Sequence, residues 1–469
     1  AFNLTNIPVY ELPAGEVLMA VGMEMIDLAG YETVDGLTEA GGSSGNPRLS
    51  TKGSYDSRDI YAEISIPLLA DVPGFQELNI DYAYRATSYS QFDSESVDRT
   101  AIKWKPINDI TIRATDSTSY KAPTISDLYF GGGGGFPTYV DPCEQNQYGT
   151  YTDAQKATAL AQCAAEGIDA TTFSTENNQI LELEVGNPNL TPEAGKNQTY
   201  GIVWEPTSIE FLENIDFKMA VDKFEMEIAN AVVGSGVAAT LNGCYINGNS
   251  AQCALIERSY GGDITSVRTA NLNSASIDLY KGTDFSFNMT FEDVAMIGGS
   301  IEVDLIGTHF EENVTVTASG ISDDVVGDCY NFGESCFNRD RVNLAVRWRN
   351  EDWNVGLTTR YLSEIPVQDG VVDYFSAEGG AYGEGTYTQA QLEDIYDIYS
   401  IPDITYTYLN VGYRYSDSVQ LTLAVSNLFD KQPPYYKDFF GFVDPQIQTP
   451  QNTYDIVGRY FQVGFKLTL

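Results

Sequence analysis

The sequence predicts an all-β chain that crosses a membrane as an antiparallel β-barrel. Three observations favour this fold: segments of about ten residues alternate apolar and polar side chains, short turns alternate with long loops, and no apolar run reaches the length of a membrane helix. The longest apolar run, Val17 to Ile26, is interrupted by Gly22 and Glu24, whereas a membrane helix needs about 18 such residues.

The pattern predicts fourteen strands, which start near residues 16, 58, 77, 99, 110, 196, 215, 272, 300, 340, 353, 405, 419 and 456. In the first segment Val17, Met19 and Val21 share one face. Near the end of the chain Phe461 and Val463 do the same. Side chains two residues apart lie on the same face of a strand, so each segment has one apolar face.

The connections alternate strictly between short and long. The short ones are LADVPGF, PIND, EPTSIEFLEN, EDVAMIGG, RNED and SDS. Long loops are expected at about residues 29–54, 116–195, 229–271, 311–338, 363–403 and 430–455. This alternation puts all long loops at one end of the strands, which is typical of outer-membrane barrels with periplasmic turns and extracellular loops. A soluble β-sandwich gives no reason for that placement.

The charge balance excludes several classes of function. The chain has 469 residues, 66 acidic and 26 basic side chains, and a net charge of -40, so binding to nucleic acid is not expected. His309 is the only histidine, so a catalytic triad or a multi-histidine metal site would have to be built around it alone. We therefore expect no enzyme and no bound cofactor.

The first residues, AFNLTNIPVY, lack the basic start and apolar core of a signal peptide. This beginning is the one expected of a mature chain or a fragment.

The six cysteines form three pairs that are close in sequence. Although six cysteines allow 15 connectivities, pairing by proximity would staple three separate polar loops, and none of the pairs has the spacing of a zinc site. The predicted disulfides, which imply an oxidising compartment outside the cytoplasm, are Cys143 with Cys163, Cys244 with Cys253, and Cys329 with Cys336.

Acidic residues concentrate in two loops. The loop at 116–195 has a net charge of -9, and the loop at 363–403 has nine acids and no base. A negative funnel that attracts cations, including Ca2+, is one interpretation, and surface hydration is the other.

Aromatic side chains in the loops are candidate ligand contacts. The glycine run 131–135 lacks the lysine of a phosphate-binding loop. We therefore interpret it as a surface loop with aromatic edges. Aromatic faces offer contact area at low entropy cost, although anchoring at an interface explains them equally well. The candidates are Tyr129, Phe130, Phe136, Tyr330, Tyr374, Tyr382 and Tyr387.

Several motifs, in order, resemble those of TonB-dependent outer-membrane receptors. They are LPAG at 12–15, SYDSRDIYAE at 54–63, YKAPTISDLY at 120–129, DPC at 141–143, GNPNLTPE at 186–193 with Lys196, NLFDKQPP at 427–434 and YDIVGRYF at 454–461. Each motif alone is weak, but their common order along nearly the whole chain is specific.

The resemblance implies a 22-stranded barrel plugged by an N-terminal domain and driven by the inner-membrane TonB complex. The plug, the TonB box and about eight strands are absent from this sequence, so residues 1–469 are expected to be the C-terminal part of the receptor barrel. The expected partners are outer-membrane lipid, the TonB complex through the missing N-terminal part, an unknown small or oligomeric ligand and a surface lipoprotein.

In such a barrel one set of arginines would face the lumen and the plug. The alternation places them on the inward rows of their strands, where they would form salt bridges or contact substrate. They are Arg113, Arg341, Arg347, Arg349 and Arg360.

The resemblance implies active import of a scarce nutrient, captured by extracellular loops and admitted when the plug moves. A plug-less passive porin, or a surface barrel whose loops bind a partner protein, remains an alternative. Oligosaccharide, siderophore, cobalamin and peptide importers share these motifs, so the ligand stays undetermined.

Overall fold

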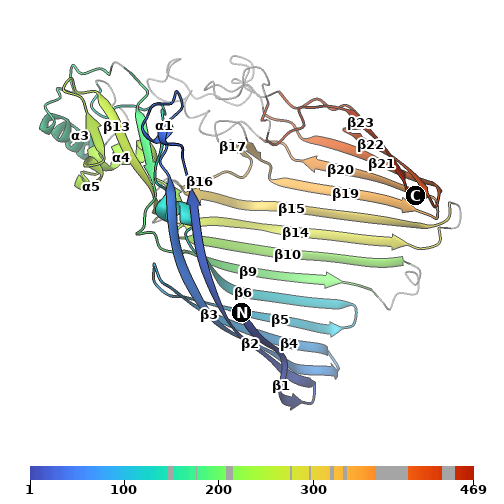
Figure 1. The fold of residues 1–469 in the computed structure, drawn as a ribbon. Coiled ribbons are helices and arrows are strands. Elements are labelled where there is room, and N and C mark those ends of the chain that lie inside the picture. The colour runs from blue at the N-terminus through green and yellow to red at the C-terminus, as the bar shows by residue number, and fades with distance from the viewer. Residues whose placement is uncertain are drawn as a thin grey trace.

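The computed structural model describes residues 1–144, 152–175, 177–206, 215–274, 277–294, 297–316, 322–330, 335–365, 400–435, 449–450 and 452–468. Most of them belong to one large antiparallel sheet whose strands follow one another in chain order (Figure 1). None of the helices in these ranges is both long and apolar enough to cross a membrane.

The main sheet is a single path of long strands, with β16 (Ser322–Asp324) paired to one of them at the side. In spatial order the path is β1 (Phe2–Leu12), β2 (Gly15–Glu32), β3 (Thr51–Val72), β4 (Phe75–Tyr89), β5 (Glu95–Ile107), β6 (Ile110–Lys121), β9 (Glu193–Trp204), β10 (Ile215–Ala229), β14 (Ile277–Phe291), β15 (Ser300–Val316), β19 (Asp340–Arg349), β20 (Trp353–Leu362), β21 (Ile404–Ser416), β22 (Val419–Ser426) and β23 (Tyr460–Leu467).

All fourteen predicted segments are strands of this sheet, and β1 precedes them as a strand that the alternation missed. The register of β1 against β2 shifts twice, between Leu4 and Ile7 and between Pro8 and Tyr10, and Asn6 has a φ of 55°. Each bulge inserts a residue and moves the following side chains to the other face, which destroys the period of two in the sequence.

Short and long connections alternate as predicted except between β4 and β5, where only residues 90–94 connect the two strands. Because the strands are antiparallel, the long connections all leave from one end of the sheet, here called the long-loop end, and the connections predicted to be short leave from the other, the short-turn end. The strands run further into the predicted loops than the alternation indicated: β2 ends at Glu32 and β3 begins at Thr51. Backbone pairing continues through polar residues there, down to Glu32 opposite Thr51.

The sheet is curved and open (Figure 1). Among the described residues no pairing joins β1 to β23, which lie at its two edges. Tryptophans mark the short-turn end: Trp104 Nε1 donates to the carbonyl of Gly74, and Trp348 Nε1 donates to that of Gly298, each at 2.9 Å.

The two faces of the sheet differ in chemistry. One row, followed through the register from β6 to β19, defines the polar face and consists of Arg113, Gly201, Asp222, Asp284, Thr308 and Arg341. On the opposite, apolar face Ile112, Ile202 and Met219 are exposed by 36%, 47% and 40%. Side chains this apolar and this exposed are suited to contact with lipid.

Two long connections fold together into a second body at the long-loop end, here called the stapled subdomain (residues 133–185 and 232–273). The connection after β6 contributes β7 (Gly133–Gly135), α3 (Asp153–Ala165) and β8 (Leu181–Val185). The connection after β10 contributes β11 (Val232–Gly234), α4 (Gly236–Tyr245), α5 (Ser250–Cys253), β12 (Ile256–Arg258) and β13 (Ile264–Asn273).

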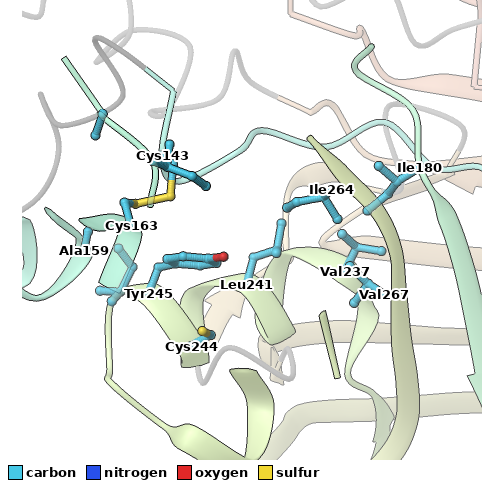
Figure 2. Packing of buried hydrophobic residues seen from close by; sticks show 13 residues of the cluster. Cys143, Ala159, Cys163, Ile180, Val237, Leu241, Cys244, Tyr245, Ile264 and Val267 are labelled. Carbon is cyan, nitrogen blue, oxygen red and sulfur yellow. A yellow bond between two sulfur atoms is a disulfide. The ribbon is translucent and has the colours of Figure 1, made fainter. Parts of the chain in front are cut away.

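The stapled subdomain has its own sheet and core. Strand β8 runs parallel to β13, so residues from two separate connections share one ladder, in the order β11-β13-β8-β7. Beneath it Leu241, Tyr245 and Val267 are buried together with both cysteines of the Cys143–Cys163 pair (Figure 2).

Short elements tie the rest of the long-loop end to the sheet. The helix α2 (Ile125–Tyr129) places Leu128 against Tyr55 of β3 and against Leu190, and the Tyr55 hydroxyl donates to the carbonyl of Pro123 at 3.1 Å. Before β3 lies α1 (Gly36–Glu39), capped by the Asp35 side chain. The pair β17 (Asp328–Tyr330) and β18 (Ser335–Phe337) follows β16.

Candidate functional site

An ion pair that crosses three strands organises the polar face. Arg113 of β6 and Asp222 of β10 lie in register with Gly201 of the strand between them, β9. The guanidinium donates to the carboxylate from Nε at 2.7 Å and from Nη2 at 2.6 Å. A Cβ on Gly201 would stand 1.8 Å from Asp222 Oδ1, so the missing side chain of the glycine leaves the space that the ion pair occupies.

Further ion pairs cover the same face at both sides of this row. Arg347 pairs with Asp304 and lies 3.4 Å from Glu302, both on the neighbouring strand β15. Arg85 of β4 donates from Nε at 3.0 Å to the Asp59 carboxylate, which is buried. The charges on the polar face therefore largely neutralise one another across the strands.

The polar face is hollowed in two places. A depression of about 650 Å³ extends over β5 to β15 and is lined by charged, hydroxyl and aromatic side chains, among them Arg99, Arg113, Asp222 and Tyr280. A second depression, of about 420 Å³, lies over β19 to β23, where the lining includes Arg349. Charged and hydroxyl side chains beside a few apolar ones suit the passage of a hydrated solute or contact with a polar protein surface.

The register places all five predicted arginines on this face. Besides the paired Arg113 and Arg347, Arg341 stacks over two rings, with its guanidinium carbon 4.3 Å from the centre of Phe337 and 5.5 Å from that of Phe310. The remaining two are Arg349, opposite Ser300, and Arg360, opposite Asn343. Whether the five face a plug stays a prediction.

The aromatic loop candidates separate into different environments. Tyr129 packs over β3, where its ring occupies the space that a Cβ on Gly53 would need. Phe130, half-buried, follows α2 as its C-terminal cap, whereas Phe136 is 51% exposed. Tyr374, Tyr382 and Tyr387 lie outside the described residues, and for Tyr330 the structure describes only the backbone, in β17.

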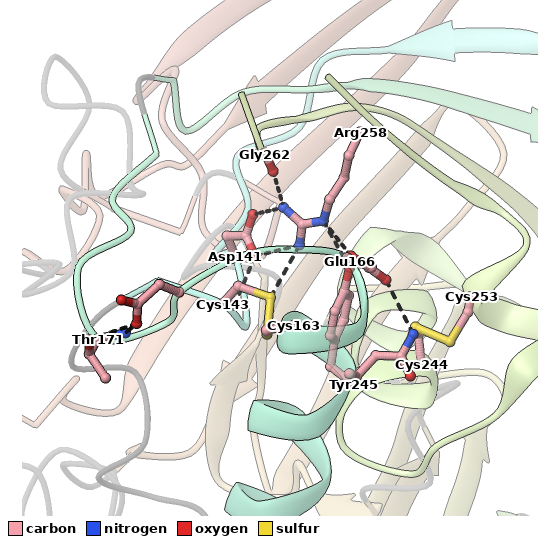
Figure 3. Close-up of a disulfide and its surroundings, with 12 residues drawn as sticks. Asp141, Cys143, Cys163, Glu166, Thr171, Cys244, Tyr245, Cys253, Arg258 and Gly262 are labelled. Carbon is pink, nitrogen blue, oxygen red and sulfur yellow. Dashed lines mark hydrogen bonds and ion pairs between the residues drawn. A yellow bond between two sulfur atoms is a disulfide. The ribbon is translucent and has the colours of Figure 1, made fainter. Parts of the chain in front are cut away.

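Two of the three predicted disulfides are present. Cys143 is bonded to Cys163 and Cys244 to Cys253, each within one connection (Figure 3). Cys336 is also disulfide-bonded, and the register of β17 against β18 sets it directly opposite Cys329. The pairing of these last two cysteines stays a prediction that this register supports.

A buried arginine joins the two connections of the stapled subdomain. Arg258 of β12 donates to both oxygens of Asp141, from Nη1 at 2.6 Å and from Nη2 at 2.8 Å (Figure 3). The side chains are 9% and 0% exposed. Nε lies 2.9 Å from the Tyr245 hydroxyl and 3.0 Å from Glu166, so four side chains form one network, here called the Arg258 cluster.

Burial and pairing shift the pKa values in this cluster in opposite senses. Burial alone would lower the pKa of Arg258, but hydrogen bonds and the charge of Asp141 outweigh it and raise that pKa. Burial raises the pKa of the Tyr245 hydroxyl, and at the neighbouring Tyr139 it raises the pKa to about 12. Arg258 therefore stays charged and the Tyr245 hydroxyl stays neutral at neutral pH.

A metal site is not formed by the described residues, since no three or more histidine, cysteine, aspartate or glutamate side chains there gather around one point. The acidic loop at 363–403 lies mostly outside the described ranges, and Ca2+ binding there stays an expectation.

Sequence reasoning missed the partners of the charged residues. Asp222 lies 109 residues from Arg113, and Asp141 lies 117 residues from Arg258. Gly201, which the ion pair requires, carried no signal because glycines are common in this chain. Only Asp141 had a local hint, since it stands two residues before Cys143 in the DPC motif.

A broad antiparallel sheet with one apolar face, one charged face and its long connections at one end defines the wall of an outer-membrane receptor barrel. Residues 7–428 match the family described as TonB dependent receptor-like, beta-barrel. The chain therefore belongs to this family, which is a family of receptors rather than of enzymes and which resides in the outer membrane.

Solved structures agree on the fold. The siderophore receptor PirA from Acinetobacter baumannii is 14% identical, with a TM-score of 0.57, and the match covers 99% of this chain and 53% of PirA. The ferric enterobactin receptor PfeA from Pseudomonas aeruginosa, solved as a mutant with enterobactin, gives 14% identity, a TM-score of 0.59 and the same coverage. The chain thus spans about half the length of these receptors. No curated protein matches.

Proposed function

We propose that this chain forms the barrel wall and the ligand-capturing loops of a TonB-dependent importer. In this proposal the long-loop end is extracellular, the stapled subdomain meets the nutrient, and a plug held against the polar face moves to admit it. The observation that carries the proposal is the polar face itself, whose paired charges and two depressions suit a wall against which a polar domain packs and past which a solute moves.

The two alternatives differ from this one in their energy requirement. A passive porin would conduct at all times, and a surface scaffold would bind a partner without transport. The apolar and polar faces are common to all three, so the test must separate them by energy coupling.

The test uses the complete receptor in its outer membrane. Cells with and without the receptor, each with and without TonB, are given radiolabelled ferric enterobactin, cobalamin or a maltooligosaccharide. We expect receptor-dependent uptake of one probe that disappears without TonB or with a protonophore. Uptake that persists without TonB, or steady conductance of the purified receptor in planar bilayers, would overturn the proposal.

A further inference from the structure

A pocket of about 520 Å³ opens on the stapled subdomain. Two segments line it: residues 166–173, which follow α3, and residues 256–262, which include β12 and the turn after it. This volume falls within the range of about 300–1,000 Å³ that is usual for small-ligand sites.

The pocket has no positive donor to offer an anion. Arg258 lines the pocket, but its N–H groups are engaged by the Asp141 carboxylate, the Tyr245 hydroxyl, the Glu166 carboxylate and the carbonyl of Gly262 (Figure 3). Nη2 in addition lies 3.6 Å from Cys143 Sγ. Since a guanidinium has five N–H donors and the protein occupies both edges of the fork, none is left for a bound molecule.

The remaining electrostatic features of the pocket are negative. Glu166 and Asp169 line it, and Arg258 is already balanced by Asp141 behind it. Helix α3, of 13 residues, ends at Ala165, so the negative end of its dipole faces the same space. Hydrogen bonds from Thr171 lower the pKa of Asp169, which keeps that carboxylate charged in mildly acidic medium.

Apolar contact comes from two aromatic rings. Phe173 lies under the turn, 3.0 Å from where a Cβ on Gly262 would be. Tyr260 is fully exposed beside the opening, and no packing within the described residues accounts for so large a ring in solvent. An aromatic face attracts a cation, and here it adjoins carboxylates.

We propose that this pocket binds a small organic cation, an amine joined to a ring or chain that stacks on Tyr260. The inference goes beyond the proposed function, because it adds to the loops a binding site for a class of molecule that the import proposal does not name. Asp169 holds the charge of the ligand, and Phe173 and Ile168 contact its apolar part.

The test measures binding to the purified full chain by ligand-observed NMR. Three probes share one ring and nearly one size: tyramine is cationic, tyrosol neutral and para-hydroxyphenylacetate anionic. We expect tyramine to bind about threefold to fivefold more tightly than tyrosol, and the anion not at all. Equal binding of the three probes, or preference for the anion, would overturn the proposal.

Matched variants locate the site. Asp169→Asn keeps an acceptor oxygen for Thr171 and should remove the preference for tyramine over tyrosol, while Tyr260→Ala should weaken both. Asp153→Asn, at the opposite end of α3, should change neither. Unreduced mass mapping of the two disulfides checks folding, and an unchanged preference in a correctly folded Asp169→Asn variant contradicts the proposal.

This test needs no TonB and no transport, so the two proposals fail separately. Loss of TonB-dependent uptake with intact tyramine binding would overturn the importer, and the reverse result would overturn only the pocket.

Discussion

The sheet and the stapled subdomain each contain an arginine–aspartate ion pair, but the two pairs differ in their exposure to water. On the polar face of the sheet Arg113 pairs with Asp222 while the two side chains are 53% and 22% exposed. In the subdomain Arg258 pairs with Asp141 at 9% and 0% exposure. Water screens the first pair and hardly reaches the second, so removing one partner leaves a hydrated charge in the sheet but a buried charge in the subdomain.

The two regions also differ in how they are built. The sheet gains its order from long ladders between neighbours in sequence, whereas the subdomain joins two connections that are far apart in sequence. It therefore depends on a core, two disulfides and one buried network. Single changes are thus expected to open the subdomain while the sheet stays intact.

The largest effect is expected from Arg258→Met. The substitution fills similar space but leaves the buried Asp141 carboxylate without its partner, which costs about 3–5 kcal/mol. Hydrogen exchange of residues 133–144 and 256–273 should accelerate strongly, while that of β3 and β4 stays unchanged.

Arg113→Met is the matched change in the sheet, with an expected cost of about 0–1 kcal/mol. If the two variants lost equal stability, or if Arg258→Met loosened the whole molecule, the contrast between the regions would be wrong.

The disulfides come next in size. Cys143 and Cys163 are 20 residues apart, and Cys244 and Cys253 are 9 apart. In the chain-entropy account a longer closed loop stabilises more, so the paired Cys→Ser variants should cost about 3 and about 2.5 kcal/mol. Protease resistance of the subdomain should fall in that order, and the reverse order would show that strain or residual structure dominates.

Strand positions could be predicted from the sequence because one buried or lipid-facing side imposes a period of two on each strand. The exception, β1, lost that period at its bulges near Asn6 and Pro8. The disulfides were predictable for a similar reason, since both confirmed pairs are local in sequence. Nothing local distinguished Arg258 or Gly201, and the DPC motif gave only a hint for Asp141, because their roles depend on a register set across long connections.

A smaller loss of stability in the subdomain is expected at high pH. Burial raises the pKa of Tyr139 to about 12, against about 10 in an unfolded chain. The folded state therefore favours the neutral phenol, and this contribution is complete below pH 10 and is lost as the pH rises through about 12. Exchange of the subdomain should accelerate across that interval, and Tyr139→Phe should suppress part of the acceleration. A variant that opens over the same range as the native chain would exclude Tyr139 as the cause.

The smallest effect concerns Gly201. Alanine there places its Cβ 1.8 Å from Asp222 Oδ1, so the carboxylate must turn away and the Arg113 pair is lost. Alanine in place of glycine also stabilises a strand by about 0.5–1 kcal/mol, which offsets that loss. Gly356→Ala is the control, because a Cβ there meets only Arg347 Cγ at an ordinary 3.9 Å.

The free energy of unfolding, measured by denaturant titration in detergent, should therefore be about 1 kcal/mol lower for Gly201→Ala than for Gly356→Ala. In an Arg113→Met background, where no ion pair remains to be lost, the difference should vanish. A difference that persists in that background would mean that the glycine is required by the backbone of β9 and not by the charges that pass over it.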